Sequence, residues 1–398
     1  MNFSYHLKNG YIYKLPAKVD NDCEYYKELF DRFDKYLEEI LSKKCYASNS
    51  IKNNVKENID LLKESLNLYR NANLDGAKEK ISNILSKYVN NETIITTIEK
   101  SYACKALAYI ERNPANEHKS KLDLMKNLDL NFFRARIGNE NLTRKDLLHI
   151  PFNKRNLIAT ERFGIPGVPC LYLGTTSYVC WLKMNKPIEN DFNVVSYKIP
   201  TNLKIIDLTF VSIPFNQSLD AIKVIEVWNK CSEEEKKLHA DRVELWPLIV
   251  ATSFNIKEKN RNFKSEYIIS HLIMQCLNDF NLDGIAYISN KISNFLVGYP
   301  YCVNLVLPMK QVDFDDIGNI YSKEMENFTL TNPIRLSEYR MLENCETKNK
   351  SYLNQIFDSN DNVAIDFAGN IIKYNKCIFS QFDDYLVSQY HTNYHNLG

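Results

Sequence analysis

Glycine and proline are almost absent from the first part of the chain, and this absence constrains the fold more than any other sequence feature. Between Ala17 and Asn113 there is no proline and a single glycine, Gly76. These two residues destabilise helix interiors most strongly, so the stretch favours helices. Apolar residues also recur there at steps of three and four, as in amphipathic helices. We predict an all-α bundle of four antiparallel helices, the last from about Glu92 to Glu111, in a domain of residues 1–120.

Beyond a polar cluster that contains Pro114, the sequence changes character. Short runs rich in β-branched and aromatic residues predict strands; they occupy residues 131–137, 168–173, 193–199, 203–208, 283–289 and 301–307. We predict helices at 176–185, 218–230 and 265–280, and a hairpin at 362–374. The elements do not alternate as in a doubly wound sheet, so an α+β fold with mixed or antiparallel sheets is predicted for residues 121–310. Residues 311–398 are expected to form a C-terminal extension that packs on this domain.

Charge and cysteine usage exclude several classes of protein. Lys and Arg (50) nearly cancel Asp and Glu (49), and the net charge of +1 gives no field that would attract bulk nucleic acid. The ten cysteines show no CxxC pair, so we predict buried thiols in a reducing compartment and no metal site. No signal-peptide core and no run of about 18 apolar residues is present. The sequence therefore predicts a soluble cytoplasmic protein without membrane association.

Four of the eleven glycines gather in one block, at Gly138, Gly164, Gly167 and Gly174. Glycine is selected where the backbone turns sharply or approaches a ligand closely. On the strand before this block, Arg134 and Arg136 fall on the same face because they are two residues apart. Paired guanidinium groups suit a pyrophosphate or a carboxylate. The alternative is that both arginines lie on a solvated sheet face.

The strings FFRARIG, IPF, RFGIPGVPCLYLGTTSYVCW and EYIISHLIMQCL…DGIAYIS closely resemble the RES domain, which occurs in bacterial toxins of toxin–antitoxin pairs and in related defence proteins. The similarity covers about residues 128 to 310. The helical region ahead of it is similar to the HEPN-type extension of some members. The resemblance implies a fold like that of ADP-ribosyltransferase toxins and cleavage of NAD+, with phosphate, water or a protein as acceptor. It also implies an antitoxin or other regulatory partner, and assembly into a homo-oligomer is a further hypothesis.

The resemblance also implies which residues act. Arg134 matches the family arginine, with Arg136 beside it, and Arg162 matches a second basic position. Tyr172 matches the tyrosine of the following strand. These four residues are predicted to bind NAD+, and Arg134 and Tyr172 are also predicted to be catalytic.

At the position of the family's catalytic glutamate, eleven residues beyond Tyr172, this chain has Lys183. A lysine reverses the charge where a cation develops, and losing one such electrostatic contribution typically costs about 10²- to 10³-fold in rate. Lys183 is either a natural change in a catalytically weak or NAD-binding protein, a substitution that silences a toxic enzyme, or a residue that does not correspond to the family glutamate. In the last case Glu161 or Glu189 could supply a carboxylate.

The family serine has no single counterpart. An ungapped match places Ile268 at its position, with Ser265 and Ser270 nearby, and we take Ser265 as the candidate. The alternative for Ser265 is a helix cap.

Other functions remain open at the sequence level. An inactive RES-like domain would be a binding module for NAD+ or ADP-ribose, or for a partner protein. The segment from Arg112 to His118, RNPANEH, is similar to the motif of HEPN ribonucleases, in which a histidine handles a proton. Pro114 inside this segment disfavours a single helix that presents both side chains.

Overall fold

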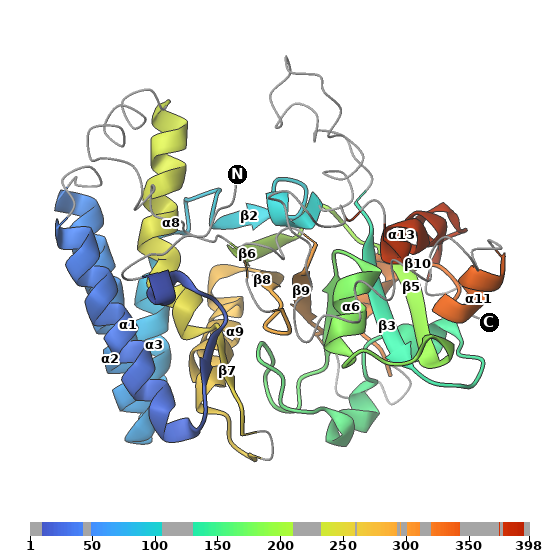
Figure 1. Ribbon diagram of the computed structural model, residues 1–398, viewed down its shortest axis with the longest axis horizontal. Helices are drawn as coiled ribbons and strands as arrows, with labels where there is room; N and C mark the ends of the chain where they lie inside the picture. The colour runs from blue at the N-terminus through green and yellow to red at the C-terminus, as the bar shows by residue number, and fades with distance from the viewer. Residues whose placement is uncertain are drawn as a thin grey trace.

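A layer of long helices lies beside a large mixed sheet in the computed structural model of the protein (Figure 1). The structure describes residues 10–42, 49–105, 130–209, 232–258, 261–292, 295, 301–310, 320–342, 374 and 377–393. The motif from Arg112 to His118, the predicted helix at 218–230 and all of the predicted hairpin at 362–374 except Tyr374 lie outside these residues. Within them the fold is α+β, as the sequence predicts, and a helical region is present at the N-terminal end.

The helical layer consists of α1 (Asp22–Ser42), α2 (Asn49–Arg70), α3 (Leu74–Ser86) and α8 (Glu233–Ala251). The first three follow the predicted periodicity, and their inner faces are buried; these faces include Leu29, Phe33, Ile59, Leu62 and Ile81. Helix α8 comes from the middle of the chain and packs against α1 and α2. Its Trp246 stacks on Tyr36 of α1, with the ring centroids 4.1 Å apart. The bundle is therefore completed by a distant segment.

The prediction of a fourth helix from about Glu92 to Glu111 is wrong for residues 92–105, the part that the structure describes. Strand β2 (Ile95–Thr97) and a 3-10 turn, η2 (Tyr102–Lys105), stand where the helix was expected. The run from Ile94 to Ile98 consists entirely of β-branched residues, which favour strands over helices. Strand β2 pairs with β6 at the edge of the large sheet, so the tertiary pairing decides this segment.

The large sheet contains all six predicted strands. In spatial order its strands are β12 (Thr392–Asn393), β10 (Thr329–Leu330), β5 (Phe192–Lys198), β3 (Phe132–Ile137), β4 (Cys170–Gly174), β9 (Val303–Pro308), β8 (Gly284–Ile288), β6 (Lys204–Leu208) and β2, and β11 (Ile334–Arg335) also pairs with β5. Only β6 and β8 are parallel among these described pairs. A separate parallel pair joins β1 (Ala17–Val19) to β7 (Phe254–Ile256).

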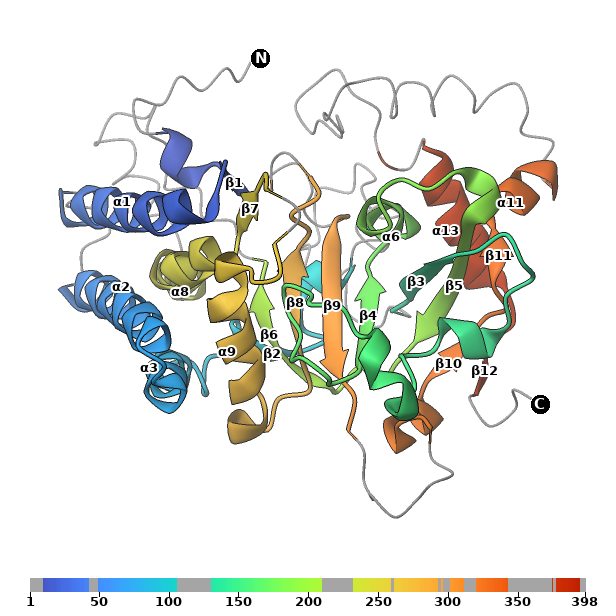
Figure 2. The same ribbon diagram turned by 90° about the horizontal axis from the view of Figure 1, so that it is seen from below.

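Four shorter helices flank the sheet. They are α6 (Ser177–Lys183), α9 (Ile268–Cys276), α11 (Leu336–Leu342) and α13 (Ile378–Ser388). Helix α9 follows the short turn η6 (Ser265–Tyr267) and packs between the sheet and α2 and α3, whereas α6 packs on β3 and β4 (Figure 2). Helices α11 and α13 lie at the opposite end of the molecule from α1, α2 and α3. Helix α13 packs against α6 and β5, so the described C-terminal residues lie against the sheet.

The remaining turns are short 3-10 segments. They are η1 (Gly10–Tyr13), η3 (Arg144–Leu147), η4 (Phe152–Leu157), η5 (Glu189–Asp191), η7 (Asn278–Phe280) and η8 (Lys323–Asn327). The segment from η4 to β4 carries Gly164, Gly167 and Gly174 and forms part of the site described next.

Candidate functional site

A pocket of about 250 Å³ lies where β3, β4, α6 and α9 meet the segment between η4 and β4. The titratable residues that line it are Arg134, Glu161, Cys170, Tyr172, Cys180, Lys183 and His271. Ligand pockets commonly measure roughly 300–1,000 Å³. The size of this pocket therefore suits one end of a large ligand.

Arg134 enters the pocket from β3. Its Nη1 donates to the carbonyl of Tyr172 and its Nη2 to the carbonyl of Leu148, each over 3.1 Å. Both acceptors are neutral, and the guanidinium makes no ion pair with any described residue. Burial lowers its pKa, yet arginine stays charged in proteins. An anionic ligand would find an unpaired cation here.

The other two predicted arginines do not line the pocket. Arg136 is exposed and donates to the carbonyl of Asp146 over 2.9 Å. Arg162 is buried and donates to the carbonyls of Ile288 (2.6 Å) and Thr252 (3.3 Å). Burial lowers the pKa of Arg162 to about 10. Only Arg134 of the three reaches the pocket.

Lys183 and Tyr172 meet inside the pocket. The Lys183 Nζ lies 3.5 Å from the centroid of the Tyr172 ring, and it makes no hydrogen bond or ion pair with a described residue. Burial lowers the pKa of Lys183 to about 8; Glu161 opposes this shift and Arg134 adds to it. The Tyr172 hydroxyl donates to the Phe163 carbonyl over 2.7 Å. Lys183, Tyr172 and Arg134, which the sequence predicted to act together, therefore share one pocket.

Two glycines of the block are required by close packing around these side chains. A Cβ at Gly164 would lie 2.8 Å from the Tyr172 hydroxyl, and a Cβ at Gly174 would lie 2.4 Å from Val179. The first glycine lets the loop close on Tyr172, and the second lets α6 lie directly against β4. Gly164 and Gly174 thus shape the pocket by close backbone approach.

The start of α6 is held by the C-terminal part of the chain. Thr176 is the N-cap of this helix, and its hydroxyl accepts from the amide of Val179. The buried carboxyl of Asp383, on α13, accepts from the amide of Ser177 (2.8 Å) and from the hydroxyl of Tyr374 (2.7 Å). Burial raises the pKa of Asp383 to about 7. These contacts fix the helix that ends at Lys183.

Glu161 is the single acidic residue among those that line the pocket. Its carbonyl accepts from the Nε2 of His271, on α9, over 2.9 Å. The other glutamate considered from the sequence, Glu189, bonds to Arg340 (2.8 Å) and is not part of the lining. Sequence reasoning had no basis for choosing between them, because α9 and β4 approach the loop only in the folded chain.

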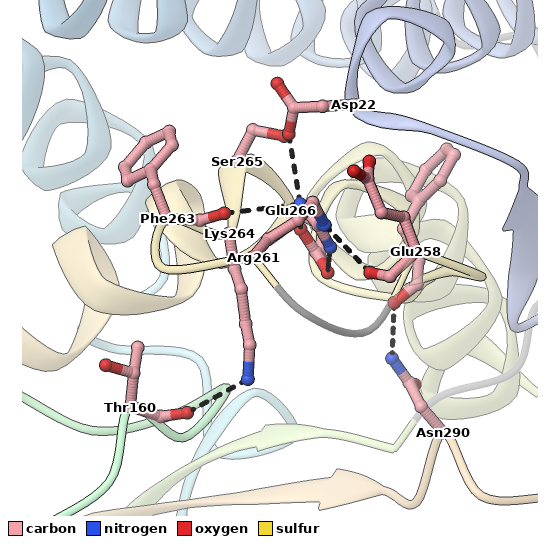
Figure 3. Close-up of polar contacts among 10 residues, drawn as sticks. Asp22, Thr160, Glu258, Arg261, Phe263, Lys264, Ser265, Glu266 and Asn290 are labelled. Atoms are coloured by element: carbon pink, nitrogen blue, oxygen red, sulfur yellow. Dashed lines mark hydrogen bonds and ion pairs between the residues drawn. The ribbon is translucent and has the colours of Figure 1, made fainter.

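Ser265 lies outside the pocket, in a polar cluster that we call the Arg261 cluster: Asp22, Arg261, Ser265 and Glu266 (Figure 3). The Ser265 hydroxyl donates to the Asp22 carboxylate of α1. Arg261 donates to Glu266 through Nη2 (2.6 Å) and Nη1 (3.1 Å), and Nη1 also reaches Asp22 (3.1 Å). Ser270 is buried in α9 and also does not line the pocket. The Arg261 cluster joins α1 to the segment that precedes α9.

The two cysteines of the pocket are poor nucleophiles. Burial raises the pKa of Cys170 to about 11 and that of Cys180 to about 12, so both remain thiols near neutral pH. The described parts of the chain hold no cluster of three His, Cys, Asp or Glu residues suited to a metal ion. No described helix is both long enough and apolar enough to cross a membrane.

Comparison with known proteins gives one informative similarity. The chain is 32% identical over 209 residues to the protein named "Putative toxin YopC" of Bacillus subtilis (strain 168), and the alignment covers 51% of this chain and 46% of that protein. The chain thus spans about half the length of this relative. No protein-family profile and no solved structure matches the chain.

Proposed function

We propose that this protein is a toxin that degrades NAD+ by cleaving the bond between nicotinamide and ribose. The toxin role is supported by the similarity to the Bacillus subtilis protein named "Putative toxin YopC". The NAD+ chemistry is supported by the RES-like sequence block. We also propose, on the resemblance alone, that an antitoxin or other regulatory partner controls the protein.

The observation that carries the proposal is the convergence of Arg134, Tyr172 and Lys183 in one pocket. Cleavage of NAD+ requires a cation near the pyrophosphate and a surface against the nicotinamide ring. Arg134 offers the unpaired cation, and Tyr172 offers the aromatic ring. The volume of about 250 Å³ suits the nicotinamide end of the dinucleotide, up to the adjoining phosphate, rather than all of it.

A second candidate function, a binding module, is favoured by Lys183. Its ammonium lies over the Tyr172 ring, where a nicotinamide cation would also stack. A fixed positive charge there opposes the positive charge that develops on the ribose during cleavage. A protein of this kind would hold NAD+ or ADP-ribose and turn it over slowly.

Release of nicotinamide from NAD+, measured with and without phosphate, tests the two candidates. We expect release by the wild-type protein and faster release by Lys183→Glu, which restores a carboxylate at this position. Phosphate dependence would identify the acceptor. If neither protein releases nicotinamide while calorimetry detects NAD+ binding, the protein is a binding module. If neither binds nor cleaves NAD+, both candidates are wrong.

A further inference from the structure

We propose that Glu161 is a catalytic residue, the carboxylate that stabilises the positive charge on the ribose when the nicotinamide bond breaks. This inference rests on the proposed NAD+ cleavage and deepens it. The residue that the family resemblance places in this role is replaced by Lys183, so the site needs a carboxylate from another position.

The first observation is that the Glu161 carboxylate is unpaired. It makes no hydrogen bond or ion pair with a described residue, although it shares the pocket with Arg134 and Lys183. Other described glutamates are paired with a cation, for example Glu266 with Arg261 and Glu189 with Arg340. Glu161, Arg134 and Lys183 line the same pocket without a partner among the described residues, so all three groups are able to meet a ligand.

The second observation is that the backbone around Glu161 is held at three points. His271 donates to the carbonyl of Glu161 itself over 2.9 Å. The Nζ of Lys264 donates to the carbonyl of the preceding residue, Thr160, over 3.4 Å (Figure 3). The following residue, Arg162, is anchored by its side chain to Ile288 and Thr252. These contacts fix the backbone from which the Glu161 side chain extends, so the carboxylate keeps its place in the pocket lining.

The third observation is the electrostatic balance of the pocket. Burial and the charge of Arg134 lower the pKa of Lys183, whereas Glu161 raises it. Arg134 and Lys183 together attract an anionic ligand, and Glu161 supplies the opposite charge that a ribosyl cation needs. Arg134 and Lys183 therefore bind the anionic part of NAD+, and Glu161 stabilises the cationic ribose.

The reaction at this site balances without an oxidant or reductant. The bond between ribose C1′ and the nicotinamide nitrogen breaks, its electron pair goes to that nitrogen, and nicotinamide leaves as a neutral molecule. The ribose C1′ carries positive charge opposite the Glu161 carboxylate. An oxygen of water then forms the new bond to C1′ and loses one proton to solvent. With phosphate as acceptor, a phosphate oxygen forms that bond instead.

Glu161→Gln tests the proposal, with Glu189→Gln as the matched control outside the pocket. The readouts are the kcat for nicotinamide release, the Kd for NAD+ by calorimetry, and the thermal midpoint as a check of folding. We expect Glu161→Gln to lower kcat by about 10²- to 10³-fold, as removal of one electrostatic group typically does. Its Kd should change by less than about threefold, and Glu189→Gln should keep the wild-type kcat and Kd.

A second variant separates a catalytic loss from a folding defect. Glu161→Asp keeps the charge, so it should recover part of the lost kcat at an unchanged thermal midpoint. If Glu161→Gln retains the wild-type kcat while the wild type cleaves NAD+, the role of Glu161 is wrong and the proposed function stands. If neither the wild type nor Lys183→Glu releases nicotinamide, the proposed function fails and the role of Glu161 fails with it.

Discussion

Charged side chains are paired in the Arg261 cluster and unpaired in the pocket, although the two regions are joined by the same short segment before α9. In the Arg261 cluster, one guanidinium binds two carboxylates, and a hydroxyl completes the contacts of Asp22. In the pocket, Arg134, Glu161 and Lys183 make no ion pair with described residues. Lys264, one residue before Ser265, links the two regions through the Thr160 carbonyl.

Paired and unpaired charges have opposite effects on the stability of this fold. A buried ion pair with complete hydrogen bonding is costly to break, because the remaining partner keeps an uncompensated charge. Unpaired charges in a pocket lower stability, and proteins retain them where function needs them. Substitutions in the two regions should therefore change stability in opposite directions.

The largest change in the free energy of unfolding is expected from Arg261→Ala. The substitution leaves the buried Glu266 carboxylate without its bidentate partner and removes a contact to α1. Breaking a buried pair in this way costs about 3–5 kcal/mol. Urea unfolding should show this loss, and Arg261→Lys should recover only part of it because a lysine cannot donate the two parallel bonds. A loss below about 1 kcal/mol would mean that the Arg261 cluster is not a stability element.

Lys183→Met should stabilise the protein, the opposite of the effect expected for Arg261→Ala. It replaces a desolvated ammonium by an apolar side chain of similar length, so we expect the free energy of unfolding at pH 7 to rise by about 1–3 kcal/mol. The folded-state pKa of about 8 lies below the ordinary value of 10.5. The wild type therefore gains stability from this group as pH rises from about 8 to 10.5. The advantage of Lys183→Met, measured by thermal unfolding, should shrink over the same window. An equal advantage at pH 7 and pH 10 would contradict the assigned pKa.

The rate of the proposed NAD+ cleavage should rise as pH passes through about 8. Above this pH the Lys183 amine is neutral, and its repulsion of the developing ribosyl cation disappears. We expect kcat to increase about five- to tenfold between pH 7 and pH 9, an effect of about 1–1.4 kcal/mol. The same profile measured on Lys183→Met should lack this step. A step that persists in the variant would assign the titration to another group.

The smallest effect is expected from Ser265→Ala. The substitution removes one hydrogen bond, from the Ser265 hydroxyl to Asp22, while Asp22 keeps its bond to Arg261. The free energy of unfolding should therefore fall by about 1 kcal/mol. Because Ser265 does not line the pocket, kcat for nicotinamide release should stay within about threefold of the wild type. A loss of kcat at unchanged stability would place the serine in the chemistry, as the family resemblance implies.

The local elements of this fold could be read from the sequence with few errors. All six predicted strands are confirmed, and so are helices α1, α2, α3, α6 and α9, because their hydrophobic periodicity agrees with their environment. Helix α8 was missed because its C-terminal half is buried on nearly every side and contains Pro247, which hides the helical period. The predicted helix at Glu92 was wrong because β6 offers a sheet edge to a β-branched run.

For the site, the glycine block could be found from the sequence alone, and the resemblance to the RES domain pointed to Arg134, Tyr172 and Lys183, because both depend on residues close together in the chain. The folded arrangement was needed to show that Glu161 lies in the pocket while Glu189 binds Arg340, and that Ser265 binds Asp22 of α1. Each of these outcomes depends on contacts between segments that are distant in the chain. A local sequence pattern does not show which distant side chain will lie opposite a given residue. The tertiary packing therefore determines which charged side chains pair in this protein.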